Sequence, residues 1–369
     1  MRVLFDYQCF VNDRVGGISK YFSKIIHHFD NDEDLQVSLE CVYSNNIYLE
    51  GMGFAKKIKT FYPNLSFKGQ RKILKLINKK LVSKEIRKQE FELFHPTYYD
   101  PYFLQFIGDR KYVITVHDMI HEIFKMNENF GKQSMLNVKR ELMQKAEKVI
   151  AVSHSTKKDI LSFVNIPEDK ISVVYHGVDT PKLFGQNSAN TTNRRPYFLF
   201  VGRRSGYKNF SFFIKTIAPF LMNLNLDIIC IGGGPFTKNE SILLKELGIF
   251  EKVINLDTVN EIELNNIYKN ALALVYPSIY EGFGMPLLEA MAYGCPVLSS
   301  QLSSLPEVGG DAVIYFDPYS PDSLTSAVNE LVKDNVKRKE MICKGKERSK
   351  LFTWEKTAQS VKEIYNSCV

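Results

Sequence analysis

The sequence predicts an α/β protein with two doubly wound domains, each built around a parallel sheet. Short apolar runs alternate with helical patterns in two successive series, and this alternation is typical of parallel sheets. A polar stretch at residues 185–195, GQNSANTTNRR, separates the two series. With 369 residues, of which 44% are hydrophobic, the chain is long enough to form two cores.

The first series contains the elements expected at the start of a doubly wound fold. Residues 3–5 form an apolar run, and Gly16 and Gly17 open a helical pattern, so we expect a strand, a glycine loop and a helix. Further strands are predicted at 91–95, 112–117 and 149–153, and a helix at 137–147.

The second series begins after the apolar periodicity ends at residues 173–179. Strands are predicted at 197–201, 226–231, 253–256, 271–276 and 296–299, each before a turn or a helical pattern. A final helical pattern covers residues 354–365. We therefore predict domains at 1–177 and 178–352, followed by a C-terminal helical segment at 353–369.

The composition indicates a soluble protein of a reducing compartment. The first residues, MRVLFDYQCF, lack the apolar stretch of a secretory signal, and no apolar run approaches the roughly 18 residues that cross a bilayer. Six cysteines are scattered without the spacing of a metal site or a disulfide framework. We therefore expect a cytoplasmic location.

A strongly basic segment covers residues 68–90. It contains nine Lys or Arg residues and two Glu, an excess equal to the net charge of +7 of the whole chain. Its apolar residues recur at helical spacing and are Ile73, Leu74, Ile77, Leu81 and Val82. Two interpretations stay open, a helix on an anionic membrane surface and a solvated helix that buries its apolar stripe in its own domain. The segment has no interleaved aromatic residues, which argues against nucleic-acid binding.

Residues 278–289, SIYEGFGMPLLE, place Glu281 and Glu289 eight positions apart across a glycine turn and a helix start. Pro286 suits the first turn of a helix. We expect the amides from Gly284 to Leu287 to be unpaired donors at the positive end of that helix, where a phosphate binds. A molecule spanning both glutamates would have a diphosphate in its middle and hydroxyls at each end, which is the shape of a nucleotide-sugar.

These motifs resemble those of the retaining glycosyltransferases of family 4, which have the GT-B fold, two Rossmann-like domains facing a cleft. The likeness is strongest over residues 278–318, SIYEGFGMPLLEAMAYGCPVLSSQLSSLPEVGGDAVIYFDP. It extends to FVGRRSGYKNF at 200–210, TVHD at 115–118 and GGISKYF at 16–22. FTWEKTA at 352–358 is similar to the start of the family's last helix, which crosses back to the N-terminal domain.

The resemblance implies separate roles for the matching residues of the C-terminal half. Glu289 would hold the ribose hydroxyls and Glu281 the hydroxyls of the donor sugar, as acceptor-only carboxylates can. Arg203 and Lys208 would bind the diphosphate and stabilise its charge as it leaves. The structural alternative for these four residues is ordinary surface charge or, for Glu289, an acid that offsets the helix dipole.

The resemblance implies further contacts from other parts of the chain. Gly16 and Gly17 would allow close backbone approach from the N-terminal domain, and His117 would contact the donor sugar near the reacting carbon. Tyr207 stands where many members have arginine, which leaves the role of Arg204 open. The expected catalytic residues are His117, Glu281, Arg203 and Lys208, and the donor contacts also include Gly282, Phe283, Gly284 and Met285.

The implied function is retaining transfer of a hexose from a nucleotide-diphosphate sugar to a glycan or lipid-linked acceptor. We expect GDP-mannose or a related GDP-sugar before a UDP-sugar as donor, and a bacterial O-antigen or capsule intermediate as product. The N-terminal domain would bind the acceptor and the C-terminal domain the donor. No cofactor or metal is expected, because the acidic residues 30–34 follow a helix and not a strand, which indicates a solvated loop.

Three alternatives differ in their sequence requirements or activity. A dehydrogenase needs G-x-G-x-x-G after the first strand, which neither the loop at 16–19 nor the one at 232–236 supplies. A nucleotide-sugar epimerase of the same fold would release free sugar or an isomerised donor without an acceptor. A sugar- or nucleotide-binding module would show no turnover.

Overall fold

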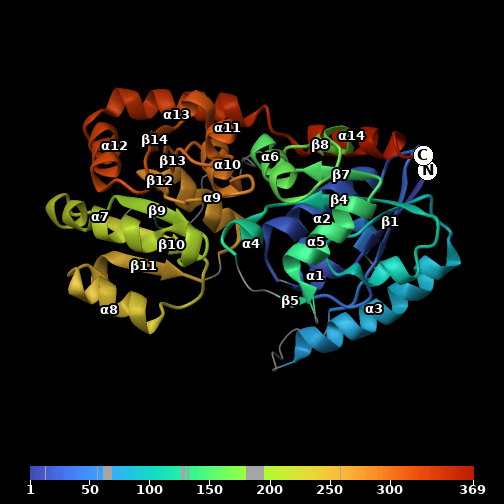
Figure 1. Ribbon diagram of the computed structural model, residues 1–369. Helices are drawn as coiled ribbons and strands as arrows, with labels where there is room; N and C mark the ends of the chain where they lie inside the picture. The colour runs from blue at the N-terminus through green and yellow to red at the C-terminus, as the bar shows by residue number, and fades with distance from the viewer. Residues whose placement is uncertain are drawn as a thin grey trace. The chain divides into compact units, whose positions relative to one another are not determined.

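The computed structural model describes the chain except for residues 13, 56, 61–68, 126–128, 131–132, 180–194 and 258. The described residues form two compact units (Figure 1). Unit 1 contains residues 1–177 together with 354–369, and unit 2 contains residues 178–353. In each unit, helices flank a six-stranded sheet in which all strands run parallel. The predicted α/β fold class is therefore confirmed.

The sheet of unit 1 has the strand order β2-β1-β3-β4-β7-β8. Its strands are β1 Arg2–Asp6, β2 Gln36–Glu40, β3 Leu93–His95, β4 Lys111–Val116, β7 Lys148–Ala151 and β8 Ile171–Val173. A two-stranded antiparallel pair, β5 Asn129–Phe130 and β6 Gln133–Ser134, lies outside it. The order places β4, which His117 directly follows, in the interior of the sheet.

The helices of unit 1 include the C-terminal one, although residues 164–353 separate it from the preceding α-helix of that unit. In α14 (Trp354–Asn366), the Tyr365 hydroxyl forms a hydrogen bond of 2.6 Å with Nδ1 of the buried His95 on β3. Its ring packs 6.0 Å from that of Phe29, the last residue of α2 (Gly17–Phe29). The helices are α1 Gln8–Asn12, α2 Gly17–Phe29, α3 Gln70–Lys88, α4 Ile120–Ile123, α5 Met135–Lys145, α6 His154–Phe163 and α14 Trp354–Asn366.

The sheet of unit 2 has the strand order β11-β10-β9-β12-β13-β14. Its strands are β9 Tyr197–Val201, β10 Asp227–Ile231, β11 Val253–Leu256, β12 Ala273–Tyr276, β13 Val297–Ser300 and β14 Ile314–Phe316. Its helices are α7 Phe210–Asn223, α8 Lys238–Glu246, α9 Glu261–Asn270, α10 Met285–Ala292, α11 Leu305–Gly309, α12 Pro321–Lys333 and α13 Asn335–Ser349.

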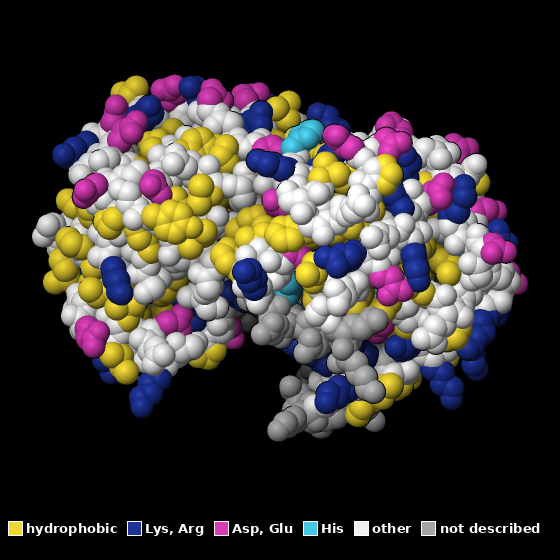
Figure 2. Space-filling model, in the orientation of Figure 1, with side chains coloured by type: hydrophobic (Ala, Val, Ile, Leu, Met, Phe, Trp, Pro, Cys, Tyr) yellow, Lys and Arg dark blue, Asp and Glu magenta, His cyan; other side chains and the backbone are white. Residues whose placement is uncertain are grey.

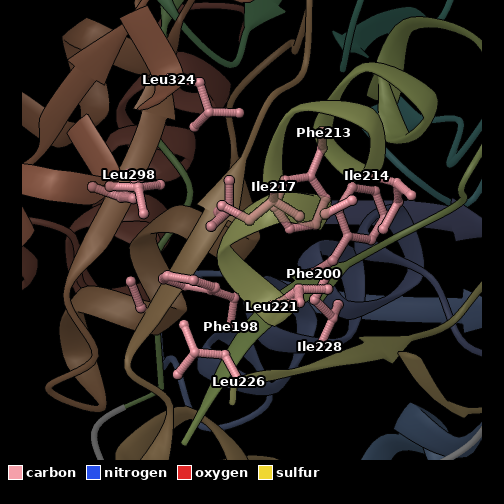
Figure 3. Close-up of a cluster of buried hydrophobic side chains, with 14 of the residues drawn as sticks. Phe198, Phe200, Phe213, Ile214, Ile217, Leu221, Leu226, Ile228, Leu298 and Leu324 are labelled. Atoms are coloured by element: carbon pink, nitrogen blue, oxygen red, sulfur yellow. The ribbon is translucent and has the colours of Figure 1, made fainter. Parts of the chain in front are cut away.

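The core of unit 2 forms where α7 packs on the sheet. Phe213, Ile217 and Leu221 recur at helical spacing and point towards Phe198 of β9 and Ile228 of β10, all with no measurable exposure (Figure 3). Burying each large apolar side chain stabilises the unit by roughly 1.5–3 kcal/mol. This packing fixes β9 in the middle of the sheet, so the loop that follows β9 has a rigid base.

The basic segment at 68–90 forms a helix, α3, as predicted from Gln70 onward; Lys68 lies outside the described residues. The interpretation in which this helix buries its apolar stripe in its own domain is only partly correct. Leu74 and Val82 are buried, but Ile73 is 41% exposed. The buried face instead continues through Asn78 and Ile86. Asn78 fits there because its amide bonds to the backbone of residues 42, 43 and 74.

Candidate functional site

Two of the predicted donor-binding segments follow neighbouring strands of unit 2. Arg203 and Lys208 lie in the loop after β9, and Glu281 lies in the loop after β12, which pairs with β9. The carboxyl ends of parallel strands meet at one edge of a sheet, where ligands bind in open α/β folds. The structure therefore brings these two segments together at that edge.

Lys208 and Glu281 form an ion pair in which Nζ lies 2.5 Å from Oε1. The two side chains are only 13% and 10% exposed, so the surrounding protein shields the pair from water. The hydroxyl of Tyr276, the last residue of β12, lies 3.1 Å from the same Nζ. Burial and the Glu281 carboxylate raise the pKa of Tyr276 well above its usual value, so the phenol stays protonated.

The backbone of Glu281 is held by two serines that follow β13. The N–H of Glu281 donates to Oγ of Ser303 at 2.9 Å, and Oγ of Ser304 donates to the carbonyl of Glu281 at 3.0 Å. Ser303 has a φ of +52°, a left-handed conformation that non-glycine residues adopt at a cost. These contacts fix the position of the Glu281 Cα.

In the turn before α10, the protein's own backbone and packing require glycine at position 284. Gly284 has a φ of +103°, and a Cβ atom there would lie 2.8 Å from Cδ2 of Leu305. One expectation is wrong, because the N–H of Leu287 donates to the Gly284 carbonyl at 3.1 Å and is not an open donor. Pro286 has no N–H, so the amides of Gly284 and Met285 are the ones left for a ligand at this end of α10.

Glu289 lies one turn into α10 and is half-buried. Its Oε2 accepts a hydrogen bond from the Tyr268 hydroxyl at 3.2 Å, and the Tyr268 ring stacks on that of Tyr293 at 5.5 Å. This bond orients the carboxylate. Tyr268 is buried on α9, and sequence patterns alone do not connect it with Glu289.

The two neighbouring arginines after β9 have different environments. Arg203 is exposed, whereas Arg204 is 7% exposed and its Nε donates to Glu240 at 2.9 Å. Arg204 therefore holds the three-glycine loop after β10 and is not available for a diphosphate. Its other acceptors are Oδ1 of Asn255 and the carbonyls of Gly232, Gly233, Gly234 and Pro235.

The remaining motif residues of the turn, Gly282 and Phe283, are buried. The Phe283 ring packs edge-on against Phe352 at 6.0 Å. Phe283 therefore contributes packing under the turn, and Met285, which is half-buried, begins α10.

In unit 1, His117 directly follows β4, as predicted. Its N–H donates to the Tyr99 hydroxyl at 3.1 Å, and its ring stacks on His176 at 5.6 Å. Its Nε2 is buried and has no hydrogen-bond partner among the described residues. Burial and the neighbouring His176 lower the pKa of His117 well below its usual value, so the ring is neutral at pH 7.

The turn after His117 is fixed by Lys139 of α5, which sequence reasoning missed. Lys139 is 1% exposed, and its Nζ donates to Oε2 of Glu122 at 3.2 Å and to the carbonyl of Asp118 at 2.9 Å. Asp118 caps the turn by accepting from the N–H of Ile120 at 3.1 Å. A buried cation therefore determines the path of the chain beyond His117.

Gly16 and Gly17 lie at the start of α2, where Gly16 is the N-cap in an extended conformation. No atom lies within 4 Å of a Cβ built on Gly17. The absence of a side chain at Gly17 therefore leaves open space at the helix start and is not required by the protein's own packing.

The acidic stretch after α2 is a largely exposed turn, as predicted. The Asp32 carboxylate pairs with Lys362 of α14 at 2.7 Å and caps the N–H groups of Asp34 and Leu35. Within the described ranges, no group of three His, Cys, Asp or Glu side chains is placed to hold a metal ion. No helix in the same ranges is both long and apolar enough to cross a bilayer.

Sequence comparison assigns both halves of the chain to one group of enzymes. A family model described as Glycosyltransferase Family 4 matches residues 16–182, and one described as Glycosyl transferases group 1 matches residues 184–348. The chain belongs to this glycosyltransferase family.

Two relatives illustrate how far the similarity of this glycosyltransferase extends. It is 31% identical to an uncharacterised glycosyltransferase of Methanocaldococcus jannaschii over 230 residues, which are 59% of each chain. It is 32% identical to the O-antigen chain mannosyltransferase RfbU of Salmonella typhimurium over 222 residues, 60% of this chain and 61% of the relative. The chain therefore matches about three fifths of the length of these relatives.

A solved structure supports the fold over the full length of the glycosyltransferase. Anabaena HepE, determined in complex with UDP and glucose, covers 100% of both chains with a TM-score of 0.75 at 19% identity. At that identity the likeness establishes the GT-B fold alone.

Proposed function

We propose that this glycosyltransferase moves a hexose from a nucleotide-diphosphate sugar to a glycan or lipid-linked acceptor. The observation that carries the proposal is the arrangement at the end of β9 and β12, where Lys208 meets Glu281 beside the start of α10. A cation and helix amides suit a diphosphate, and a carboxylate suits sugar hydroxyls. Unit 2 would bind the donor, and unit 1 would bind the acceptor.

The proposed reaction retains the anomeric configuration and needs no cofactor or metal. The bond from the anomeric carbon to the phosphate oxygen breaks, and an acceptor oxygen bonds to that carbon on the same face. The acceptor proton passes to a phosphate oxygen of the leaving diphosphate. Arg203, Lys208 and the amides of Gly284 and Met285 would stabilise the negative charge that develops there. His117, neutral at pH 7, would contact the donor sugar.

GDP-mannose is the first donor to test, because the Salmonella relative is an O-antigen chain mannosyltransferase. A UDP-sugar is the second. The product in this proposal is an O-antigen or capsule intermediate. Thermal shift with GDP, UDP and their sugars identifies the base, since a ligand at 100 times its Kd adds about 2.7 kcal/mol of stability.

Transfer to an acceptor lipid extract then tests the reaction, with labelled donor and analysis of the product's anomeric configuration. A labelled glycolipid supports the proposal. Isomerised donor or free sugar formed equally without acceptor would instead indicate an epimerase or a hydrolase. Donor binding without any turnover would indicate a binding module.

We further propose that α3 contacts an anionic membrane and so brings the enzyme to a lipid-linked acceptor. On its exposed face, Leu76 is 67% and Ile73 is 41% exposed. Lys and Arg side chains lie along the lower right edge of the molecule, over α3 (Figure 2). The exposed cations of this helix are Arg71, Lys72, Lys80, Lys84, Arg87 and Lys88. Each cation near an anionic surface contributes about 1 kcal/mol of binding, and inserted apolar side chains add to it.

Cosedimentation with phosphatidylglycerol vesicles tests the membrane contact. Replacing Lys72, Lys80 and Lys84 with Glu should abolish binding to these vesicles. The matched control replaces Lys333, Lys339 and Lys344 with Glu, all exposed in unit 2. It should bind the vesicles like the wild type. Equal loss in both triple variants, or binding to neutral phosphatidylcholine vesicles, would contradict a specific role of α3.

A further inference from the structure

Tyr276 contacts the central ion pair of the candidate site although it belongs to none of the motifs singled out from the sequence. It ends β12, and its side chain is 1% exposed. Its hydroxyl lies 3.1 Å from Nζ of Lys208, and the same Nζ lies 5.1 Å from the centre of the Tyr276 ring. Tyr276 therefore contacts the ammonium group through both its oxygen and its ring.

A lysine ammonium needs such contacts to hold one position. The side chain has four rotatable carbon bonds, and the group has three N–H donors. Two acceptors are present, the Tyr276 hydroxyl and Oε1 of Glu281. When both are engaged, the ammonium is fixed in direction and its third N–H remains for a ligand.

The two acceptors differ in how they respond to a donor. The Glu281 carboxylate sits on a loop and, in the proposed function, also accepts hydrogen bonds from the sugar. The Tyr276 hydroxyl is carried by a buried ring on a central strand, so it keeps its place when Glu281 engages the sugar. The phenol stays protonated and neutral, so it holds the ammonium without cancelling its charge.

We propose that Tyr276 is a positioning residue whose hydroxyl directs the Lys208 ammonium towards the diphosphate of the donor. This inference rests on the proposed function and adds a residue to it. It assigns no chemical step to Tyr276.

The test is a double-mutant cycle of Tyr276→Phe with Lys208→Met, measured as affinity for the preferred nucleotide diphosphate and as kcat/KM. Tyr276→Phe keeps the ring and removes only the hydroxyl. We expect both quantities to fall about tenfold, as for the loss of a hydrogen bond to a charged group. In the Lys208→Met background, the same substitution should have a much smaller effect, because the group it positions is gone and only the hydrogen bond of the hydroxyl with Glu281 is lost.

Tyr197→Phe is the matched control. Tyr197 is buried at the start of β9, and its hydroxyl donates to the carbonyl of Ile267 at 2.8 Å. It should lower thermal stability without changing nucleotide affinity or kcat/KM. Tyr276→Phe could lower only thermal stability, as Tyr197→Phe should. Its loss of affinity and of kcat/KM could also add fully to the loss caused by Lys208→Met. In either case Tyr276 is structural and the inference is wrong.

The affinity cycle separates this inference from the proposed function. Wild-type protein that binds a nucleotide but transfers no sugar contradicts the proposed function, and the cycle in affinity still decides the role of Tyr276. Additive losses in an enzyme that transfers sugar contradict the Tyr276 inference alone. Wild-type protein that binds no nucleotide diphosphate contradicts both.

Discussion

The ammonium of Lys208 lies 2.5 Å from the carboxylate of Glu281 in a pair that is almost shielded from water. In the proposed complex these residues bind different parts of the donor, the diphosphate and the sugar. The free protein therefore holds the two groups neutralised by each other, and a donor must share Lys208 with Glu281.

Glu281→Gln should change nucleotide binding and transfer in opposite directions. Affinity for GDP or UDP without a sugar should rise severalfold, because Lys208 loses its competing partner and a nearby negative charge is removed. Sugar transfer should fall at least a hundredfold. Calorimetry and initial rates measure the two effects, with the exposed Glu246→Gln as control. Reduced affinity of the variant for the nucleotide without a sugar would contradict the assigned roles. A covalent sugar adduct on Glu281 of the wild type would contradict them as well.

Arg203 and Arg204 should give opposite phenotypes although they are adjacent. Arg204→Met removes a buried guanidinium and takes away the partner of Oε1 of Glu240 and of several loop carbonyls, so it should destabilise unit 2 by roughly 3–5 kcal/mol. Arg203→Met alters an exposed side chain and should reduce kcat/KM with little loss of stability. Chemical denaturation and kinetics compare the pair. Equal stability of the two variants would show that Arg204 does not hold the glycine loop.

Two substitutions of Ser303 distinguish the cost of its left-handed backbone conformation from the hydrogen bond that its hydroxyl makes with Glu281. Both Ser303→Ala and Ser303→Gly lose the acceptor for the Glu281 N–H and should lower turnover to a similar extent. Ser303→Gly should be more stable than Ser303→Ala by about 1 kcal/mol, because glycine adopts the observed φ of +52° at little cost. Thermal unfolding and initial rates give the two readouts. Normal turnover in both variants would show that the hydroxyl does not position Glu281.

The free energy of unfolding should decrease as the pH is lowered, because buried histidines stay neutral in the folded protein. Burial lowers the pKa of His95 and of His176 to about 3, whereas an unfolded histidine titrates near pH 6.5. Between these values the unfolded chain binds more protons. Their stabilising contribution is therefore complete above about pH 6.5 and is lost as the pH falls, on the order of 1 kcal/mol per pH unit for each histidine.

Denaturation of the wild type and of His176→Gln between pH 7 and pH 5 measures this dependence. The variant should show the shallower slope. The comparison isolates the histidine from Asp6, whose buried carboxyl has a raised pKa and acts in the opposite direction. Parallel slopes would mean that His176 is not buried as a neutral ring.

The interior strands were predictable from the sequence, and most edge strands were not. The runs that became β9 and β10 are continuous and apolar because both faces of a central parallel strand are covered. The sequence analysis missed three strands, β2, β8 and β14. They are short or mix polar with apolar residues, and each lies at a sheet edge with a neighbouring strand on one side only. Their pairing depends on contacts far away in sequence, which periodicity does not contain.

The residues that contact ligand in the proposal were found from motifs, whereas those that hold them were not. Glu281 and Lys208 lie in patterned loops, but Tyr276 and Ser303 become relevant only when β12 and β13 bring their ends together. Arg204 has the same residue type as Arg203, and only its burial against Glu240 separates their roles. The sequence shows which side chains are present, but only the fold shows which of them already have partners within the protein.

The most direct test of the central proposal is a calorimetric titration of GDP-mannose and UDP-glucose into the wild type and into the Glu281→Gln, Glu289→Gln double variant. The wild type should bind at least one donor, and the double variant should lose the contacts to the sugar and the ribose, with at least a tenfold weaker Kd. Equal donor affinity in the two proteins would contradict a donor site built on these carboxylates.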